Sequence, residues 1–177
     1  MTDNTAIKLI HDGSQEALGI LYEKYFDRIL QYSYRRTFDK QIAYDISANV
    51  FIKVAENIAK FKPKHENAFI GWLFKIASNE VIAYYRKPEK YKSSVSLDET
   101  ILDGELEAGA ESDANLLDTV ELYKNLHKAL KKQKKKEQTI VDLYYFENLS
   151  YKEISLSTGI KESNVGVILH RTVKKLH

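Results

Sequence analysis

Polar and basic side chains near the C-terminus recur at a spacing suited to contact with a nucleic acid. Between Leu149 and Leu176 they alternate with apolar residues at three- and four-residue steps. Lysine and arginine attract phosphate, polar side chains can bond to base edges, and an apolar side chain can meet a thymine methyl group. The candidate contact residues are Lys161, Ser163, Asn164, Val167, His170, Arg171 and Lys174.

A helix-turn-helix would present these side chains on the outer face of its second helix. Ser150-Tyr-Lys-Glu153 has the form of a capping box, which marks a helix start, and Gly159 can take the left-handed conformation of a sharp turn. Apolar residues of both helices and of the preceding helix, residues 137–146, would form the core: Ile140, Leu143, Tyr144, Ile154, Ile160, Val165 and Leu169. An ordinary helical hairpin is the alternative, but the basic residues that follow favour DNA binding.

The middle of this second helix, Gly166-Val-Ile168, carries no basic side chain. Glycine destabilises a helix by about 1 kcal/mol relative to alanine, so Gly166 predicts a close approach to a backbone or a groove wall. Val167 is expected to face the bases, and Ile168 to widen the apolar stripe. Positive charge lies instead towards the helix ends, which indicates reading by phosphate contacts and shape.

Charge and composition divide the chain of 177 residues into three parts. Residues 97–121 carry nine acidic and no basic side chains, whereas the segments on either side are net basic. This acidic part either tethers two domains or mimics a nucleic-acid strand. The run of lysines over residues 131–136 either stabilises a helix C-terminus or contacts phosphate.

Enzyme activity is not expected from this composition. The chain has no cysteine, and its five histidines do not stand at metal-ligand spacing. Neither a Gly-rich phosphate loop nor an apolar run of about 20 residues occurs, and the first residues do not have the pattern of a signal peptide. We therefore expect no cofactor, no metal, no membrane insertion and a cytoplasmic location.

Helical periodicity dominates the N-terminal half. Ser14 and Asp39 have the residue types of N-caps for two long helices, and a third helix is predicted from about Ala68 to Arg86, ending before Pro88. The stretch Lys62-Pro-Lys-His-Glu-Asn67 reads as a loop. A further helix is predicted from about residue 116 to residue 130. The predicted class is all-α, with small helical domains over residues 1–92 and 116–177 and an acidic linker over residues 93–115.

The order of these parts resembles a bacterial RNA polymerase sigma factor of the extracytoplasmic-function (ECF) type. The resemblance rests on four stretches in the correct order: Glu16-Ala-Leu-Gly-Ile-Leu-Tyr-Glu-Lys-Tyr25; Asp45-Ile46 with Val50-Phe51; Phe69-Ile-Gly-Trp-Leu-Phe-Lys-Ile-Ala77 with Asn79; and Tyr145-Phe-Glu-Asn-Leu-Ser-Tyr-Lys-Glu-Ile154 with Leu169-His-Arg171. It implies a helical region 2 domain, a linker and a helix-turn-helix region 4 domain. It also implies core RNA polymerase and promoter DNA as partners, and members are commonly clamped by an anti-sigma factor.

The resemblance assigns the melted downstream (minus-ten) element to region 2 and the upstream (minus-thirty-five) element to region 4. Capture of unstacked bases uses aromatic side chains beside basic groups that follow the phosphates. The loop and third helix offer such a set: Lys62, Lys64, Asn67, Trp72, Lys75, Asn79 and Arg86. By resemblance the loop holds a flipped base, with Lys64 and Asn67 nearest to it. Trp72 is either a core residue or a base contact, and only one of Tyr84 and Tyr85 is expected to face inward.

The second long helix is the implied polymerase-docking element. Its candidate contacts are Asp45, Asn49, Phe51 and Lys53. The family commonly has Gln-Glu where this chain has Ala48-Asn49, so a carboxylate is missing. A stand-alone helix-turn-helix regulator, or a sigma-like interaction module without promoter activity, is the alternative function.

Overall fold

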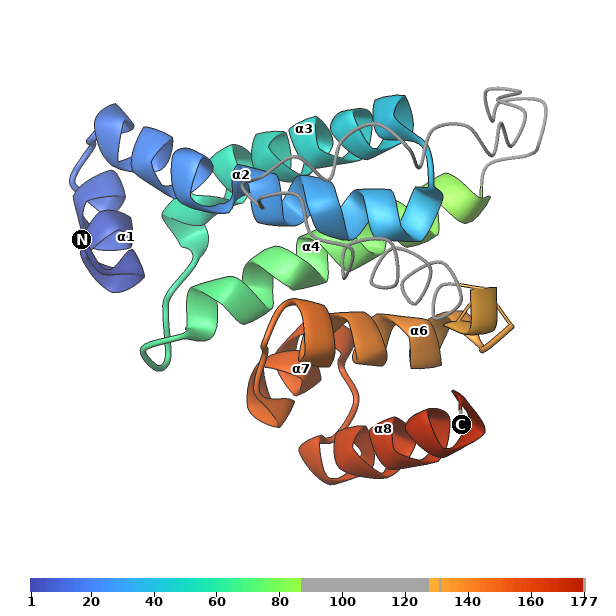
Figure 1. Cartoon of the computed structure of the whole chain (residues 1–177). Helices are drawn as coiled ribbons and strands as arrows, with labels where there is room; N and C mark the ends of the chain where they lie inside the picture. The colour runs from blue at the N-terminus through green and yellow to red at the C-terminus, as the bar shows by residue number, and fades with distance from the viewer. Residues whose placement is uncertain (87–127, 131, 177) are drawn as a thin grey trace, which may run out of the picture.

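The computed structural model describes residues 1–86, 128–130 and 132–176, and every regular element in them is helical (Figure 1). This confirms the predicted all-α class. The predicted linker, Pro88 and most of the helix expected over residues 116–130 lie outside the described residues.

The N-terminal helices form a bundle. They are α1 (Asp3–His11), α2 (Gln15–Thr37), α3 (Lys40–Asn57), the short 3₁₀ helix η1 (Ile58–Lys60) and α4 (Ala68–Arg86). Ser14 and Asp39 cap α2 and α3 as expected, because their side chains accept hydrogen bonds from the amides of Ala17 and Ile42. Helix α1, capped by Thr2, was not predicted.

The C-terminal helices are α6 (Lys135–Val141), the π-helical turn η4 (Asp142–Phe146), α7 (Tyr151–Thr158) and α8 (Glu162–Leu176). The helix predicted over residues 137–146 therefore begins two residues earlier and widens to a π-helix in its second half. In Figure 1 this orange and red part lies against one side of the N-terminal bundle.

The two halves share a continuous core rather than standing apart. Buried apolar side chains from α1–α4 and from α6–α8 belong to one cluster. Helix α4 packs on α2 and α3 with one face and on α7 with another. The remaining face of α4 is open to solvent, so its position in the fold decides which of its side chains can meet a ligand.

Candidate nucleic-acid interface

The helix-turn-helix begins with the capping box that the sequence predicts. The Ser150 hydroxyl accepts a hydrogen bond from the Glu153 amide, and the Glu153 carboxylate accepts one from the Ser150 amide. Gly159 ends α7 with a left-handed φ of 71°. The apolar residues expected between the helices are buried or partly buried: Ile140, Leu143, Tyr144, Ile154, Ile160, Val165 and Leu169.

The outer face of α8 presents six of the seven residues predicted to contact the upstream element, and the seventh, Lys161, lies in the turn just before the helix. Their side chains are exposed, whereas Val165, Leu169 and Thr172 point into the domain. Val167, which is 46% exposed, is the apolar member of this face. The exposed set is Lys161, Ser163, Asn164, Val167, His170, Arg171 and Lys174.

The lack of a side chain at Gly166 lets the two helices of the motif approach each other closely. A Cβ atom at this position would lie 3.1 Å from Cε2 of Tyr151, at the start of α7. The Tyr151 ring packs in turn on Tyr144, with 5.4 Å between ring centroids. The close approach of Gly166 is therefore made to an aromatic ring of the same domain, and not to a backbone or a groove wall as expected. Ile168 packs against the core as predicted.

The C-terminal end of α8 is attached to α6 by an ion pair. Nζ of Lys175 lies 2.9 Å from the Glu137 carboxylate. The hydrogen bond from Lys175, followed by one from the Lys134 amide, lowers the pKa of Glu137. Lys175 thus connects the end of α8 to α6, beside the exposed Lys174.

The open face of α4 carries four of the residues predicted for the downstream element. Trp72, Lys75, Asn79 and Arg86 follow one another at three-, four- and seven-residue steps, which keeps them on one side of the helix. Lys75, Asn79 and Arg86 are exposed. This face also includes Ile82, which is 43% exposed.

Trp72 and the two tyrosines of α4 are half-buried. The Trp72 ring stacks on Phe61, with 4.6 Å between centroids and 24° between planes, and packs against the core. Tyr84 and Tyr85 both pack against the core, so the expectation that only one faces inward was wrong. The Tyr85 hydroxyl donates a hydrogen bond to the carbonyl of Arg36, which helps to fix the position of the Tyr85 ring.

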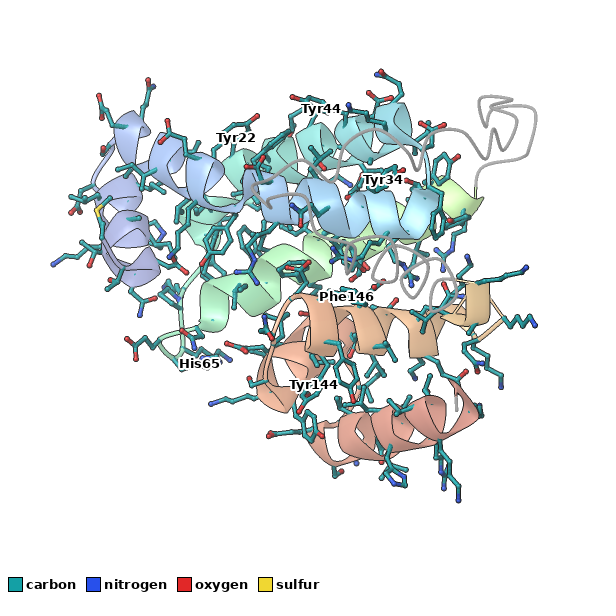
Figure 2. The ribbon with its side chains drawn as sticks, in the orientation of Figure 1. Tyr22, Tyr34, Tyr44, His65, Tyr144 and Phe146 are labelled. Carbon is teal, nitrogen blue, oxygen red and sulfur yellow. The ribbon has the colours of Figure 1, made fainter. Side chains whose placement is uncertain are left out.

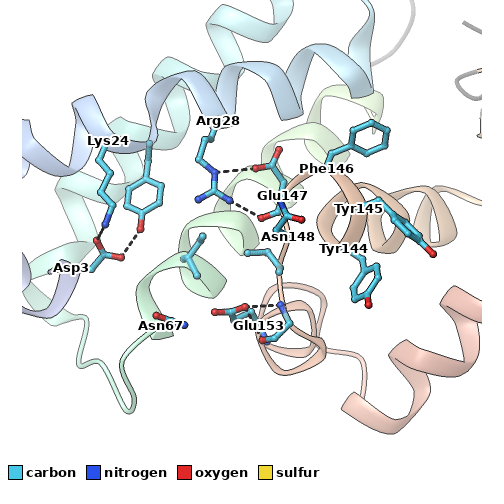
Figure 3. Close-up of a pocket in the computed structure, with 14 residues that line it drawn as sticks. Asp3, Lys24, Arg28, Asn67, Tyr144, Tyr145, Phe146, Glu147, Asn148 and Glu153 are labelled. Atoms are coloured by element: carbon cyan, nitrogen blue, oxygen red, sulfur yellow. Dashed lines mark hydrogen bonds and ion pairs between the residues drawn. The ribbon is translucent and has the colours of Figure 1, made fainter. Parts of the chain in front are cut away.

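The loop before α4 brings three predicted residues to the surface: Lys62, Lys64 and Asn67 are all exposed. Asn67 also lines an open groove of about 900 Å³ between the two halves, which we call the interdomain groove (Figure 3). Arg28 of α2 and Glu147 of the C-terminal half face one another across it. Sequence analysis did not predict this groove, because it is formed by residues far apart in the chain.

Helix α3 presents Asp45 and Asn49 to solvent, and Lys53 pairs with Glu80 of α4 at 2.5 Å. Phe51, which was also predicted to contact polymerase, does not lie on the surface, because it is only 7% exposed and belongs to the core. Its ring lies 4.9 Å from that of Tyr22, which is 42% exposed. Tyr22 and Tyr44 lie on the side of the bundle away from α7 and α8 (Figure 2).

The described part of the chain contains no group of three His, Cys, Asp or Glu side chains placed to hold a metal ion. Within those same residues no helix is both long and apolar enough to cross a membrane.

Comparison with known proteins matches both halves to one family. Residues 21–90 match the family model of sigma-70 region 2, and residues 123–176 match that of sigma-70 region 4. RNA polymerase sigma factor YlaC of Bacillus subtilis is 29% identical over 89% of this chain and 88% of its own length. ECF RNA polymerase sigma factor SigW of the same organism is 28% identical over 93% of this chain and 89% of its own.

Among solved structures, that of CnrH in complex with the cytosolic domain of CnrY shares the fold. Its TM-score is 0.71 at 18% identity, covering 98% of this chain and 94% of that one. Two family regions in the expected order, relatives matched over most of their length, and exposed basic side chains on α4 and α8 lead to one assignment. The chain belongs to the ECF sigma factors of RNA polymerase, which direct promoter recognition through regions 2 and 4 and are not enzymes.

Proposed function

We propose that the C-terminal domain reads the upstream promoter element with the outer face of α8. One observation carries this proposal: the six candidate residues of α8 and Lys161 just before it are all exposed, while Val165 and Leu169 between them are buried. Lys161 and Lys174 would hold phosphates at the two ends of the face. Val167, Asn164 and Arg171 would then meet base edges in the major groove.

The N-terminal domain would capture the melted downstream element. Lys62, Lys64 and Asn67 come from the loop, and Trp72, Lys75, Asn79 and Arg86 from the open face of α4. Basic side chains would follow the phosphates of the single strand, as in other single-strand binders. Asn67 can bond to a base edge, which favours it as the residue that recognises an extruded base.

Helix α3 would dock on core RNA polymerase. Asp45, Asn49 and Lys53 share its outer face at four-residue steps. Two exposed apolar side chains adjoin them, Tyr44 at 51% and Ile52 at 55%. Phe51 would contribute indirectly, because its buried ring packs against the ring of Tyr22. Apolar side chains beside polar ones are typical of protein interfaces.

A cytoplasmic location follows from this proposal, because core polymerase and promoter DNA are found there. Residues 1–92 and 116–177 would act as the two domains, with residues 93–115 as the acidic linker between them. We also propose that an anti-sigma factor regulates the chain. The complex of CnrH with the cytosolic domain of CnrY supports this, since the partner is bound to a protein of the same fold.

Reconstitution with core RNA polymerase tests the proposed function. The chain and core enzyme would transcribe fragmented genomic DNA of the source organism, and the 5′ ends of the transcripts would be mapped. We expect start sites that share an upstream and a downstream motif at constant spacing. Core binding without initiation would contradict promoter activity, and specific binding to a short duplex without polymerase would indicate a stand-alone regulator.

A further inference from the structure

Helix α1 precedes residues 21–90, which match region 2 of the family, and carries none of the proposed DNA contacts. It nevertheless packs on both α2 and η1, and its Ala6 and Ile7 are each only 1% exposed. A helix of nine residues is only marginally stable by itself in water, so its contacts with the bundle hold it in place. Two polar contacts indicate which parts of the bundle α1 restrains in turn.

The start of α1 is attached to α2 by one carboxylate. Oδ1 of Asp3 lies 2.6 Å from Nζ of Lys24, and Oδ2 accepts a hydrogen bond of 2.5 Å from the Tyr25 hydroxyl (Figure 3). The Asp3 side chain is 11% exposed, so this contact is shielded from most of the solvent. Burial, followed by the hydrogen bond to Asp3, raises the pKa of Tyr25. The Tyr25 hydroxyl therefore keeps the proton with which it binds Asp3.

The end of α1 is attached to the segment that leads into the loop before α4. Nε2 of His11 lies 3.0 Å from the carbonyl oxygen of Ile58 and donates a hydrogen bond to it. Ile58 is 2% exposed and is the first residue of η1, which is followed by Phe61 and then by the loop over residues 62–67. His11 thus holds the backbone shortly before the loop begins.

Aromatic rings connect these attachments to both ends of the loop. The Tyr25 ring lies 5.6 Å from that of Phe69, which follows the loop in α4. Phe61, which precedes the loop, lies 6.1 Å from Phe69 and stacks on Trp72. Because Phe69 is fully buried, it cannot move without disturbing the rings packed around it. Tyr25 and η1 therefore help to fix the positions at which the loop starts and ends.

The shape of the loop depends on these two ends. Residues 62–67 belong to neither helix nor strand, and the proposed contacts Lys62, Lys64 and Asn67 are exposed. A group that is already ordered before binding loses less conformational entropy when its ligand arrives. An exposed loop with fixed ends can therefore present these side chains in one arrangement.

We propose that α1 is a positioning element for capture of the melted strand: through Asp3 and His11 it holds the loop over residues 62–67 in the conformation that receives an extruded base. This inference rests on the proposed function, because it assumes that the loop binds a single strand. Asp3 and Asn67, the residue proposed to recognise the base, line the same interdomain groove (Figure 3). Asp3 and His11 are positioning residues, since they act through Tyr25 and Ile58.

Two substitutions loosen these attachments without removing apolar atoms from the core. Asp3→Asn keeps the shape of the side chain but removes the charge that pairs with Lys24, and His11→Ala removes the donor to Ile58. His11→Gln retains an amide donor and is the conservative variant. Asp12→Asn is the matched control, because Asp12 is an exposed carboxylate at the other end of α1.

The first measurement is binding of a single strand by the full chain in complex with core polymerase. The probe is a labelled oligonucleotide with the downstream motif of the mapped start sites, and a scrambled oligonucleotide gives the non-specific affinity. Asp3→Asn with His11→Ala should weaken binding of the motif about 3- to 10-fold, the effect of one lost hydrogen bond, and leave binding of the scrambled strand unchanged. His11→Gln should bind the motif better than His11→Ala, and Asp12→Asn should bind it like the wild type.

The ratio of the two affinities separates positioning from general loss of structure. Equal losses for both strands, or no loss for the motif, would overturn the positioning role, because a destabilised bundle weakens both affinities together. Absence of any preference for the motif in the wild-type complex would instead contradict the proposed function of the loop.

The second measurement needs neither DNA nor polymerase, so it is independent of the proposed function. The chain has no cysteine, and Glu66 is an exposed residue of the loop, so Glu66→Cys provides a single site for a spin label. The mobility of this label should increase when Asp3→Asn and His11→Ala are added, but not when Asp12→Asn is added. Unchanged mobility in the loosened variant would overturn the inference. A label at Glu162→Cys, at the start of α8, should not respond to either change.

Discussion

Replacing Gly166 by alanine tests how the two helices of the DNA-reading motif hold each other. Alanine should favour the helix by about 1 kcal/mol over glycine. Its Cβ would, however, lie 3.1 Å from the Tyr151 ring, which must then move. That ring is 37% exposed and can swing outward, but at the expense of its contact with Tyr144. An aromatic pair of this kind contributes about 0.5–1.5 kcal/mol.

These two effects nearly cancel, so Gly166→Ala in the wild-type chain should change the free energy of unfolding by less than about 0.5 kcal/mol. In a Tyr151→Ala background the steric cost is absent, and the same substitution should stabilise by about 1 kcal/mol. The difference between the two backgrounds is the coupling energy of the pair. Urea unfolding of the four proteins, followed by circular dichroism, would measure it.

Equal effects of Gly166→Ala in both backgrounds would refute the role given to Tyr151. Gly19→Ala is the matched control, because Gly19 is also helical and a Cβ there meets no atom within 4 Å. Its effect should be the same with and without Tyr151. If Tyr151 sets the orientation of α8, then Gly166→Ala should also weaken binding to the upstream element while the fold stays intact.

Arg171→Ala should weaken binding of the upstream element by about 1–3 kcal/mol if the side chain makes a bidentate base contact, and an unchanged affinity in a duplex titration would remove it from the reading face. Lys64→Ala should slow promoter opening, measured by permanganate footprinting, more than it weakens duplex binding; equal effects would argue against a single-strand role. Ile154→Ala removes a fully buried side chain and should destabilise the C-terminal domain by about 2–5 kcal/mol in urea unfolding, whereas a loss below 1 kcal/mol would contradict its place in the core. Burial raises the pKa of Asp142 above its ordinary 3.8, outweighing the opposite effect of Arg35 and Arg36. The folded chain therefore binds this proton more readily than the unfolded chain, so the contribution of Asp142 to the free energy of unfolding should rise as the pH falls towards the raised pKa, and Asp142→Asn should abolish that rise.

The open face of α4 illustrates what sequence periodicity can predict. Trp72, Lys75, Asn79 and Arg86 recur at helical steps, and the structure has them on one side of the helix. Periodicity alone left the role of Trp72 undecided. Its half-burial depends on Phe61, which lies outside the helix and stacks on it only in the folded chain.

Local signals in the sequence by themselves determined the start of α2, both ends of α7 and the core of the helix-turn-helix. The side chains of Ser14 and Ser150 accept hydrogen bonds from amides three residues away, and Gly159 ends a helix by its left-handed backbone conformation. Each of these features therefore depends on only a few neighbouring residues. The alternation of Val165 and Leu169 with polar residues likewise reports which face of α8 is buried.

Only the tertiary structure decided how the two domains meet. Arg28 and Glu147 are 119 residues apart, and Gly71 is separated from Ser157 by 86 residues. In the sequence, the α2 arginines and Asp142 look like ordinary helix-surface charges, and Gly71 and Gly166 look like unfavourable helix residues. Their roles depend on which surfaces come together in three dimensions, because charge burial and close helix contact are properties of the packed molecule and not of any short segment.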